Sequence, residues 1–312
     1  MIERIPITDR EQWLSLRKAD VTASAVGALF GMHPYQSAYG LFQEKNGLDL
    51  DEPDSGVLRR GRLLEGVVAL CVEEQHPEWK IEKATDYFRD PVVRVGCTPD
   101  FFAHSDPRGL GIIQAKTVAP SVFRNSWTDE GPPMWIALQA ATEMMLTGAT
   151  WGAVAALIVD PFKLDCMIYP IPKHDGVEQR IVDAVRQFWN DVEFGVEPKP
   201  DFKRDADLIA SMFPTAVEFK TIDLSGDNYL PEILRERAEE KARIKRAEDR
   251  VKEIDAEIKF KIGDAEIATL ADFTITNKVS HRKGYEVKPT SYRSLRITDH
   301  RPKEEIYGDG NF

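Results

Sequence analysis

Apolar residues recur every three or four positions in several stretches of the chain, a spacing that predicts amphipathic helices. Short helices are expected in the first fifty residues, where Thr8 or Asp9 precedes the first of them as a cap. Beyond these, helices are predicted over residues 38–45, 55–75, 134–147, 175–194 and 229–262. The apolar seam of the last helix is narrow and interrupted, which argues against a long coiled coil.

Between these helices, alternating or short continuous apolar runs predict strands. The predicted strands cover residues 79–88, 92–96, 101–105, 111–117, 151–159 and 165–171. Pro198 and Pro200 then mark a boundary. We therefore expect a mixed α/β core with a helical N-terminal segment over residues 1–197. Residues 198–312 should form a helical arm and a closing β-hairpin, the hairpin starting near Ala268 and extending to Ile297.

Composition narrows the class of protein. Of 312 residues, 42% are hydrophobic, which supports a sizeable core, and 41 basic against 52 acidic residues give a net charge of −11. This balance excludes a uniformly basic nucleic-acid coat, although a local basic groove can exist on an acidic protein.

Three cysteines, widely separated, support neither a disulfide framework nor a structural zinc site. The N-terminus is charged from its third residue, unlike a signal peptide, and the longest apolar run, Trp151–Val159, is far below the roughly 18–20 residues that span a bilayer. The expected location is the cytosol.

The strongest chemical signal is the segment from residue 96 to residue 117, in which Asp100 should end one strand and Gln114-Ala115-Lys116 the next. The ends of antiparallel neighbours can converge, and Gln114 and Lys116 share a face because side chains alternate along a strand. Oxygen ligands from both strands, with an ammonium beside them, would suit Mg²⁺.

Glu65, on the predicted helix upstream, could supply a further carboxylate. Such a site hydrolyses phosphodiesters, since a metal ion activates water and a lysine positions that water or stabilises developing charge. The segment alone is also compatible with a turn aspartate and a solvated lysine.

The segment resembles the PD-(D/E)XK nuclease motif, and further features resemble the YqaJ-like viral recombinases, the family of phage lambda exonuclease. These include Trp13 and Arg17 in W-x-x-x-R, followed by T-A-S with Ser24, then Glu65 in RRGRLLEG. A T-G turn follows the helix after the lysine, and Asp90 stands ten residues before Asp100. The matches run from about residue 10 to residue 160.

The resemblance implies a restriction-endonuclease-like fold and a role for each matching residue. Asp100 and the Ala115 carbonyl would bind the metal with Glu65, and Lys116 would be the catalytic lysine. Arg17 and Ser24 would bind the 5′-terminal phosphate of DNA, although an ordinary surface arginine and a helix cap would look the same. Asp90 would contact the residues that bind the metal and would not bind the metal itself.

Two departures concern the metal site and its surroundings. The family's usual glutamate is Gln114 here, so an amide oxygen replaces a carboxylate and metal affinity should fall. Where the lambda enzyme has two glutamines two residues apart, this chain has Gln139 and Ala141, so Gln139 could serve the site or only pack its helix.

The resemblance implies a Mg²⁺-dependent 5′-to-3′ exonuclease, with Mn²⁺ able to substitute, that digests double-stranded DNA ends for phage-type recombination in a bacterial cytoplasm. It also implies a single-strand annealing partner and a homo-oligomer, a trimer in the lambda enzyme. Three alternatives stay open at this point: an inactive DNA-end-binding protein, an endonuclease of the same fold, and an interaction protein with a chance motif.

Overall fold

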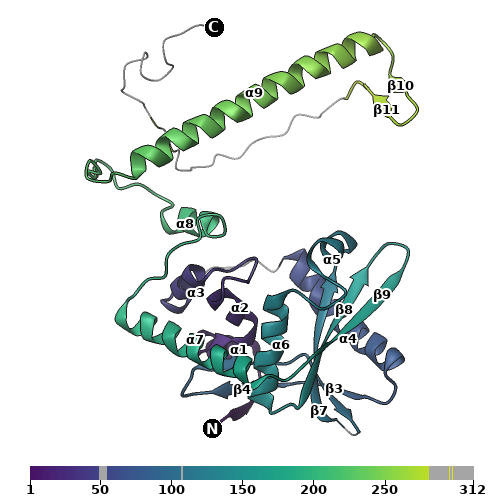
Figure 1. Cartoon of the computed structure of the whole chain (residues 1–312), viewed down its shortest axis with the longest axis vertical. Coiled ribbons are helices and arrows are strands. Elements are labelled where there is room, and N and C mark those ends of the chain that lie inside the picture. Colours follow the sequence, from purple (N-terminus) through teal and green to yellow (C-terminus); the bar gives the residue numbers. More distant parts are fainter. Residues whose placement is uncertain (49–54, 107, 281–294, 296, 298–312) are drawn as a thin grey trace. The chain divides into compact units, whose positions relative to one another are not determined.

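The computed structural model describes residues 1–48, 55–106, 108–280, 295 and 297 (Figure 1). The chain divides into two compact units, Met1–Met212 and Phe213–Phe312. The division lies later than the boundary predicted after residue 197, because the following residues bind the first unit. The Asp205 carboxylate accepts a hydrogen bond from the Ser37 hydroxyl (2.6 Å), and the Arg204 guanidinium donates to the His33 carbonyl (2.8 Å).

The helices of the described chain are α1 (Arg10–Ala19), the 3₁₀ turn η1 (Ala23–Ala25), α2 (Val26–Leu29), α3 (Ala38–Lys45), α4 (Gly56–Gln75), α5 (Pro120–Ser126), α6 (Met134–Thr147), α7 (Asp175–Phe194), α8 (Ala206–Met212) and α9 (Leu230–Ile262). The strands are β1 (Glu3–Pro6), β2 (Val21–Thr22), β3 (Lys80–Lys83), β4 (Asp86–Asp90), β5 (Val95–Cys97), β6 (Phe101–Ser105), β7 (Gly109–Val118), β8 (Trp151–Val159), β9 (Leu164–Ile171), β10 (Ile267–Thr269) and β11 (Thr274–Thr276).

The central sheet has the order β3-β6-β7-β8-β9. Its strands pair antiparallel except β7 and β8, which are parallel and are joined by a crossover through α6. Two neighbouring parallel strands need a connection long enough to carry the chain back to the end of the sheet at which the first strand began. The segment that contains α6 provides this connection. The mixed α/β class expected from the sequence is confirmed.

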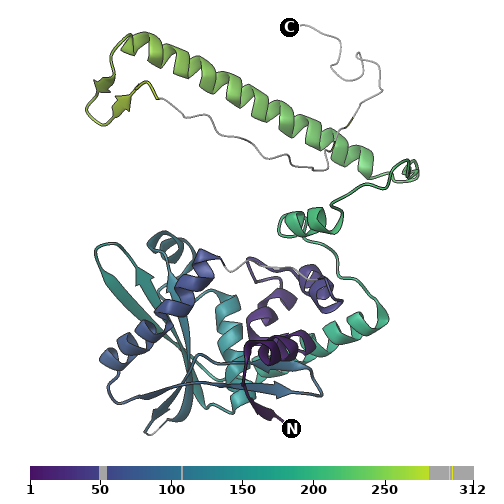
Figure 2. The same ribbon diagram turned by 180° about the vertical axis from the view of Figure 1, so that it is seen from behind.

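Helices α4 and α6 cover opposite faces of this sheet (Figures 1 and 2). Alternation along β7 explains the division, because Ile112 packs with α6 whereas Ile113 packs with α4. Both isoleucines are fully buried. The side chains of Gln114 and Lys116 therefore belong to the α6 face of β7.

A smaller sheet of order β1-β4-β5-β2 completes the first unit. Its apolar face packs with α2, α6 and α7 in a core that includes Val21, Val95, Leu138, Ile181 and Phe188. The same core includes Ala23 and Ala25 of η1, the turn that carries the predicted phosphate-binding residue Ser24.

Helix boundaries follow capping chemistry. Asp9 caps α1 by accepting the Gln12 N–H (2.8 Å), and Ser55 caps α4 by accepting the Leu58 N–H (3.2 Å). Gly148 ends α6 with a left-handed backbone (φ +74°) that few residues other than glycine adopt readily.

Three strand predictions are corrected. The single strand expected over residues 79–88 is two strands, β3 and β4, which belong to different sheets. In residues 92–96, Val92 and Val93 form a turn and only the end of the segment enters β5. Asp100 precedes β6 rather than ending a strand, because residues 98–100 turn the chain from one sheet to the other.

The second unit contains α9 and the hairpin of β10 and β11, which agree with the predicted long helix and with the start of the closing hairpin. The rest of the predicted hairpin, up to Ile297, lies almost entirely outside the described residues. Among the residues that the structure describes, no helix is both long and apolar enough to cross a membrane.

Candidate active site

The hairpin of β6 and β7 brings Asp100 to the Gln114-Ala115-Lys116 triplet. Phe101 pairs with Ile113, so the residue before β6 lies beside the residue that follows Ile113. The Asp100 carboxylate accepts the Ala115 N–H (2.8 Å) and a hydrogen bond from the Gln114 side-chain amide. The same amide nitrogen lies 3.5 Å from the Ala115 carbonyl oxygen, so oxygen atoms from both strands converge on one point.

Helix α6 supplies partners for the lysine of the triplet. The Lys116 ammonium donates to the Gln139 side-chain oxygen (3.0 Å), and the Gln139 amide donates to the Glu143 carboxylate (2.9 Å). Gln139 and Glu143 are four residues apart and therefore share one face of the helix. The chain Lys116–Gln139–Glu143 fixes the lysine head beside Asp100. Gln139 consequently contacts the site and does more than pack its helix.

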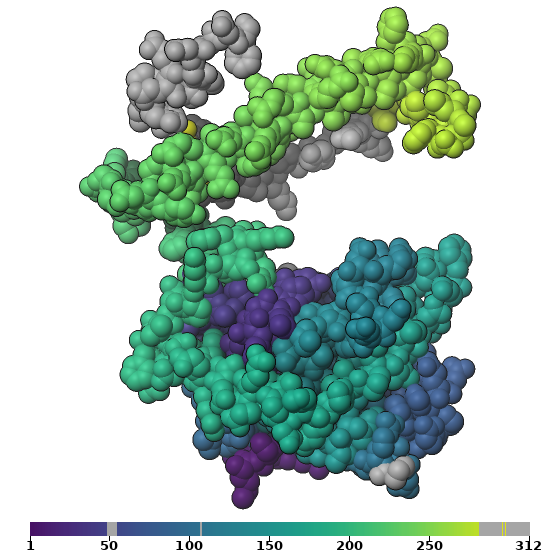
Figure 3. All heavy atoms as spheres, in the orientation of Figure 1, coloured from purple at the N-terminus to yellow at the C-terminus, as the bar shows by residue number. Residues whose placement is uncertain are grey.

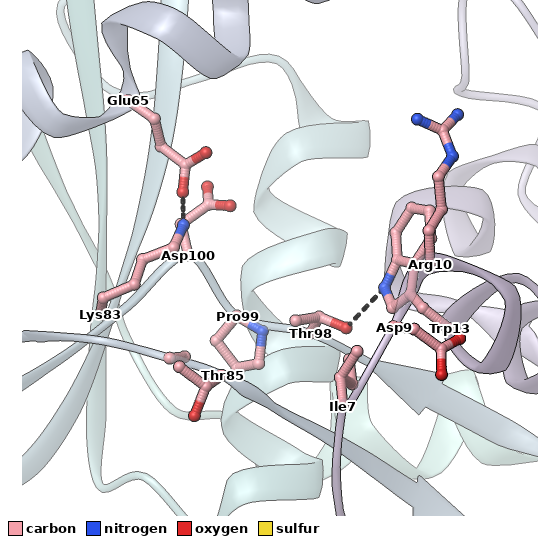
Figure 4. A pocket seen from close by; sticks show the side chains of 11 residues that line it. Ile7, Asp9, Arg10, Trp13, Glu65, Lys83, Thr85, Thr98, Pro99 and Asp100 are labelled. Carbon is pink, nitrogen blue, oxygen red and sulfur yellow. Dashed lines mark hydrogen bonds and ion pairs between the residues drawn. The ribbon is translucent and has the colours of Figure 1, made fainter.

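Glu65 reaches the same region from α4, where it pairs with the Lys83 ammonium at the end of β3. Figure 4 shows this ammonium beside the Glu65 carboxylate, with the Asp100 carboxylate next to them. Lys83 also lies over the Phe101 ring, 4.9 Å from its centroid. A protein cation is thus paired with Glu65 and acts on the charge of Asp100, two carboxylates that were predicted to bind a metal.

Burial governs the electrostatics of this cluster. It raises the pKa of the Asp100 carboxyl above its ordinary value, although Lys116, the Ala115 N–H and Lys83 all act to lower it. Burial likewise lowers the pKa of the Lys116 ammonium, opposed by Asp100 and Glu143. Glu143 is 1% exposed, and burial, together with the nearby Asp100 charge, raises its pKa to about 8. At neutral pH Glu143 is therefore mainly protonated.

A pocket of about 500 Å³ connects this cluster with the N-terminal helix. Glu65, Lys83 and Asp100 line one end, and Trp13 of α1 lines the other (Figure 4). The Trp13 indole donates to the Thr98 hydroxyl (3.1 Å), which holds the ring against the turn that carries Asp100. The pocket therefore joins an aromatic surface to the carboxylates.

Of the two predicted phosphate ligands, Arg17 lies beside Trp13 at one end of the pocket. The Arg17 guanidinium stacks over the Trp13 ring, 4.5 Å from its centroid, and burial lowers its pKa. Ser24 lies in η1, where its hydroxyl is 3.0 Å from that of Thr22. In the described part of the chain no hydrogen bond joins Arg17 to Ser24, so a shared phosphate stays a prediction.

Asp90 lies at the end of β4, in the turn that leads to β5. Its carboxylate accepts the backbone N–H groups of Val92 (2.9 Å) and Val93 (3.0 Å). This turn contact accounts for an aspartate at the position without any contribution to a metal site.

The donor set fits a magnesium ion in its chemistry. Asp100, Glu65, the Ala115 carbonyl and the Gln114 amide all offer oxygen, which Mg²⁺ prefers. The Gln114 side-chain oxygen is buried and has no hydrogen-bond partner among the described residues. Turning the amide over would direct this oxygen at the Asp100 carboxylate, an arrangement that only a cation between them would stabilise. The residues therefore fit the ion once the amide has turned.

Acidic ligands alone would not make this site. Within the described residues, no group of three or more His, Cys, Asp or Glu side chains is placed to hold a metal ion. A site here needs the amide and backbone oxygens of Gln114 and Ala115 in addition to carboxylates.

Comparison with known families supplies the remaining observation. The model of the YqaJ-like viral recombinase domain matches residues 12–150, a range that holds Trp13, Asp100, Lys116 and Glu143. This segment, a little under half of the chain, is similar to YqaJ-like viral recombinase domains. The domain supports the assignment of the protein as a nuclease. A comparison with curated proteins finds no match.

Solved structures similar to this chain include two exonucleases. One is an alkaline exonuclease, LHK-Exo, from Laribacter hongkongensis, with 20% identity, a TM-score of 0.46, and coverage of 64% of this chain and 100% of that one. Another is a phage-related exonuclease from Haemophilus somnus, with 12% identity, a TM-score of 0.44, and coverage of 57% and 96%.

Two polar residues at the site, Glu143 and Lys83, were not predicted from the sequence. Glu143 follows Gln139 by one helical turn within an apolar stretch, and a charged residue on a helix face expected to be buried was an available signal. Lys83 gave no such signal, because it occurs in an alternating charged strand. Only the pairing of β3 with β6 brings it to Asp100.

Proposed function

We propose that this protein is a metal-dependent nuclease that degrades double-stranded DNA from its 5′ ends during phage-type recombination. The observation that carries the proposal is the convergence of Asp100, Gln114 and the Ala115 carbonyl beside the half-buried Lys116. A carboxylate, neutral oxygens and an ammonium within one cleft are the groups that phosphodiester hydrolysis requires.

Mg²⁺, with Mn²⁺ as a substitute, would be held by Asp100, Gln114, the Ala115 carbonyl and Glu65. When bound, the ion would supply Lewis-acid stabilisation of the phosphate and a water of lowered pKa. Lys83 competes for the same carboxylates, since its ammonium pairs with Glu65. A cation that enters the site must therefore displace or rearrange this lysine.

Lys116 would act on the reacting groups directly. Held by Gln139, its ammonium can orient the attacking water or stabilise the negative charge that develops on the phosphate. Glu143 would act only through Gln139, as a positioning residue. Because Glu143 is mainly protonated at neutral pH, it adds little negative charge to a cleft that must accept an anionic substrate.

The DNA end would enter at the Trp13 side of the pocket. Arg17 is a fork-shaped donor that suits a terminal phosphate, and Ser24 offers a hydroxyl. We assign the 5′-phosphate preference to these two residues. We propose further that the protein works in the cytoplasm of a host cell, as a homo-oligomer, with a single-strand annealing protein that receives the exposed strand.

A second function is favoured by one specific observation. One Asp100 oxygen accepts two hydrogen bonds from protein N–H groups, Lys116 and Lys83 lie near this carboxylate, and Glu65 is paired with Lys83, so the carboxylates have protein cations beside them without any metal. A protein in this state could bind DNA ends without cutting them. Loss of the family's glutamate at Gln114 would then have converted a nuclease into an end-binding protein.

One experiment tests both functions. Linear duplex carrying a 5′-phosphate and an internal label is incubated with the protein in Mg²⁺, in Mn²⁺ or in EDTA, and a covalently closed circle is included as a control. Progressive loss of the linear duplex with either metal, and none in EDTA, supports the exonuclease. Retarded but intact duplex under all three conditions would establish the end-binding protein instead, and cleavage of the circle would indicate an endonuclease.

A further inference from the structure

Three aromatic side chains, called the aromatic row below, extend from Lys116 to the protein surface. The Lys116 ammonium lies over the Trp135 ring, 5.5 Å from its centroid. The His33 ring meets Trp135 edge to face (4.8 Å between centroids), and Tyr35 meets His33 in the same way (6.0 Å). Tyr35 is 81% exposed, so the last ring of the row is accessible to a ligand.

Helix α6 places the first ring of the row beside the proposed reaction centre. Trp135 is four residues before Gln139, so the two side chains share one face of the helix. The Lys116 ammonium contacts both of them, since it also donates to the Gln139 oxygen (3.0 Å). Among the described residues that line the pocket near Trp13 and Asp100, Trp135 is absent. The aromatic row is therefore a second surface next to the same lysine.

The loop that carries the other two rings is fixed by hydrogen bonds. The His33 Nδ1 atom accepts the backbone N–H groups of Tyr35 (3.2 Å) and Gln36 (3.0 Å). The Arg204 guanidinium donates to the His33 carbonyl (2.8 Å). The rings are thus held in place before a ligand arrives, which reduces the entropy lost on binding.

Close packing of α2 on α6 brings this loop to Trp135. A β-carbon on Gly27 of α2 would lie 2.7 Å from the Trp135 β-carbon, so the two helices can approach this closely only because residue 27 is glycine. Figure 3 shows the purple surface of the N-terminal residues beside the blue-green surface of residues from α5 and α6. The His33 backbone N–H donates to the Gly27 carbonyl (3.1 Å), which keeps His33 next to Trp135.

Two cations lie beside the aromatic row. Lys116 contacts Trp135, and Arg204 is bonded to the His33 carbonyl. Burial, followed by the charges of Lys116 and Arg204, lowers the pKa of the His33 imidazole to about 4. The imidazole is therefore neutral at pH 7, and the positive charge of this surface comes from the lysine and the arginine. Such a surface suits a ligand that carries both flat rings and negative charges.

An unpaired nucleic-acid strand has this chemistry. Proteins bind single strands through aromatic rings on which bases stack and through cations that attract the phosphates. Inside a duplex the faces of the bases are covered by neighbouring bases, so an exposed ring such as Tyr35 can stack only on unpaired ones. On the basis of the proposed nuclease function, we propose that the aromatic row binds unpaired nucleobases of the DNA strand whose phosphate reaches Lys116.

Binding in EDTA tests the proposal without hydrolysis. Fluorescence anisotropy gives the affinity of the full-length protein for a labelled single-stranded oligothymidylate and for an abasic strand of the same length, which keeps the phosphates but lacks the bases. The wild type should bind the oligothymidylate more tightly, on the order of tenfold. Tyr35→Leu should lose this preference and bind the abasic strand as the wild type does, because only stacking has been removed.

Further variants separate stacking from other effects. Tyr35→Phe keeps the ring and should keep the preference for bases. Phe162→Leu removes another exposed ring, in the turn between β8 and β9, and should also keep the preference. Trp135→Leu should lose it, and circular dichroism verifies that this variant retains its fold.

The result does not depend on whether the protein cuts DNA. A wild type with equal affinity for the two strands, a preference that survives in either leucine variant of the row, or equal weakening on both strands would overturn the proposal. Cleavage of linear duplex in Mg²⁺ together with equal affinities would refute the aromatic row alone. A preference for the oligothymidylate in a protein that cuts no DNA would refute the nuclease alone.

Discussion

Charged side chains of the candidate active site, called the cleft below, and of α9 occupy opposite environments. In the cleft, Asp100, Lys116 and Glu143 are linked through Gln114 and Gln139, and each depends on the others because burial disfavours its charged form. Along α9, the charged residues lie in water and pair with neighbours one turn away. Removing one charge from the cleft leaves another unpaired, whereas charges on α9 can be exchanged with little cost in free energy.

This contrast predicts where function should be sensitive to single substitutions. Changes in the cleft should affect hydrolysis and stability together. Exchanging exposed charges on α9 should leave the chemistry of the cleft intact.

Replacing Asp100 or Lys116 should abolish hydrolysis. We expect losses on the order of 10³ or more, measured as the rate of release of labelled nucleotides from linear duplex. Asp100→Asn is preferable to Asp100→Ala, because an asparagine oxygen can still accept the Ala115 N–H, which alanine would leave unpaired at a cost of about 1–3 kcal/mol. The molecular mass of the protein in solution should not change. Hydrolysis at the wild-type rate by either variant would refute the site.

Gln114→Glu should strengthen metal binding by restoring the family's carboxylate. Without metal, the new charge faces Asp100 and should lower the melting temperature; with Mg²⁺ the loss should reverse. We expect the Mg²⁺ concentration for half-maximal stabilisation to fall on the order of tenfold. Thermal unfolding across a Mg²⁺ titration measures this without relying on activity. Identical titrations for variant and wild type would place Gln114 outside the metal site.

Arg17→Ala should weaken the preference for a 5′-phosphate. A charged hydrogen bond of about 1.5 kcal/mol corresponds to a preference of roughly tenfold between 5′-phosphorylated and 5′-hydroxyl duplex, which the variant should lose. Lys18→Ala, a charge loss at the neighbouring position, is the control and should retain it. Equal rates on the two ends in the wild type would reject this role for Arg17.

Glu143→Gln should change how stability depends on pH. The pKa of Glu143 is raised from 4.5 to about 8 in the folded protein, so this residue favours folding at low pH. That contribution is lost as the pH rises through this interval, because the unfolded chain releases the proton first. The variant should therefore lose less stability than the wild type between pH 5 and pH 8, by about 2–4 kcal/mol.

Chemical denaturation at several pH values gives this difference directly. Glu239→Gln on α9 is the matched control, since the same substitution is made at an exposed position. Its unfolding free energy should follow that of the wild type at every pH. A Glu143→Gln profile parallel to the wild type would show that the buried carboxyl does not titrate in this range.

Local patterns in the sequence determined most of the secondary structure and the grouping of the residues proposed to be catalytic. Helices α3, α4, α6, α7 and α9 follow from apolar periodicity, capping residues and glycine stops, all of which act between near neighbours in the chain. Asp100, Gln114 and Lys116 could be grouped because they are separated by one short hairpin. The charge pattern of α9 is likewise contained in its own sequence.

Only the tertiary structure decided which residues meet across elements. The pairing of β3 with β6 brings Lys83 to Asp100 and Glu65, and the packing of α6 on the sheet brings Glu143 to Lys116 through Gln139. The division of residues 79–88 between two sheets could not be predicted either, because apolar and polar residues alternate in the same way before and after the break. Such contacts depend on burial and on partners far away in the chain, and periodicity carries no information about either.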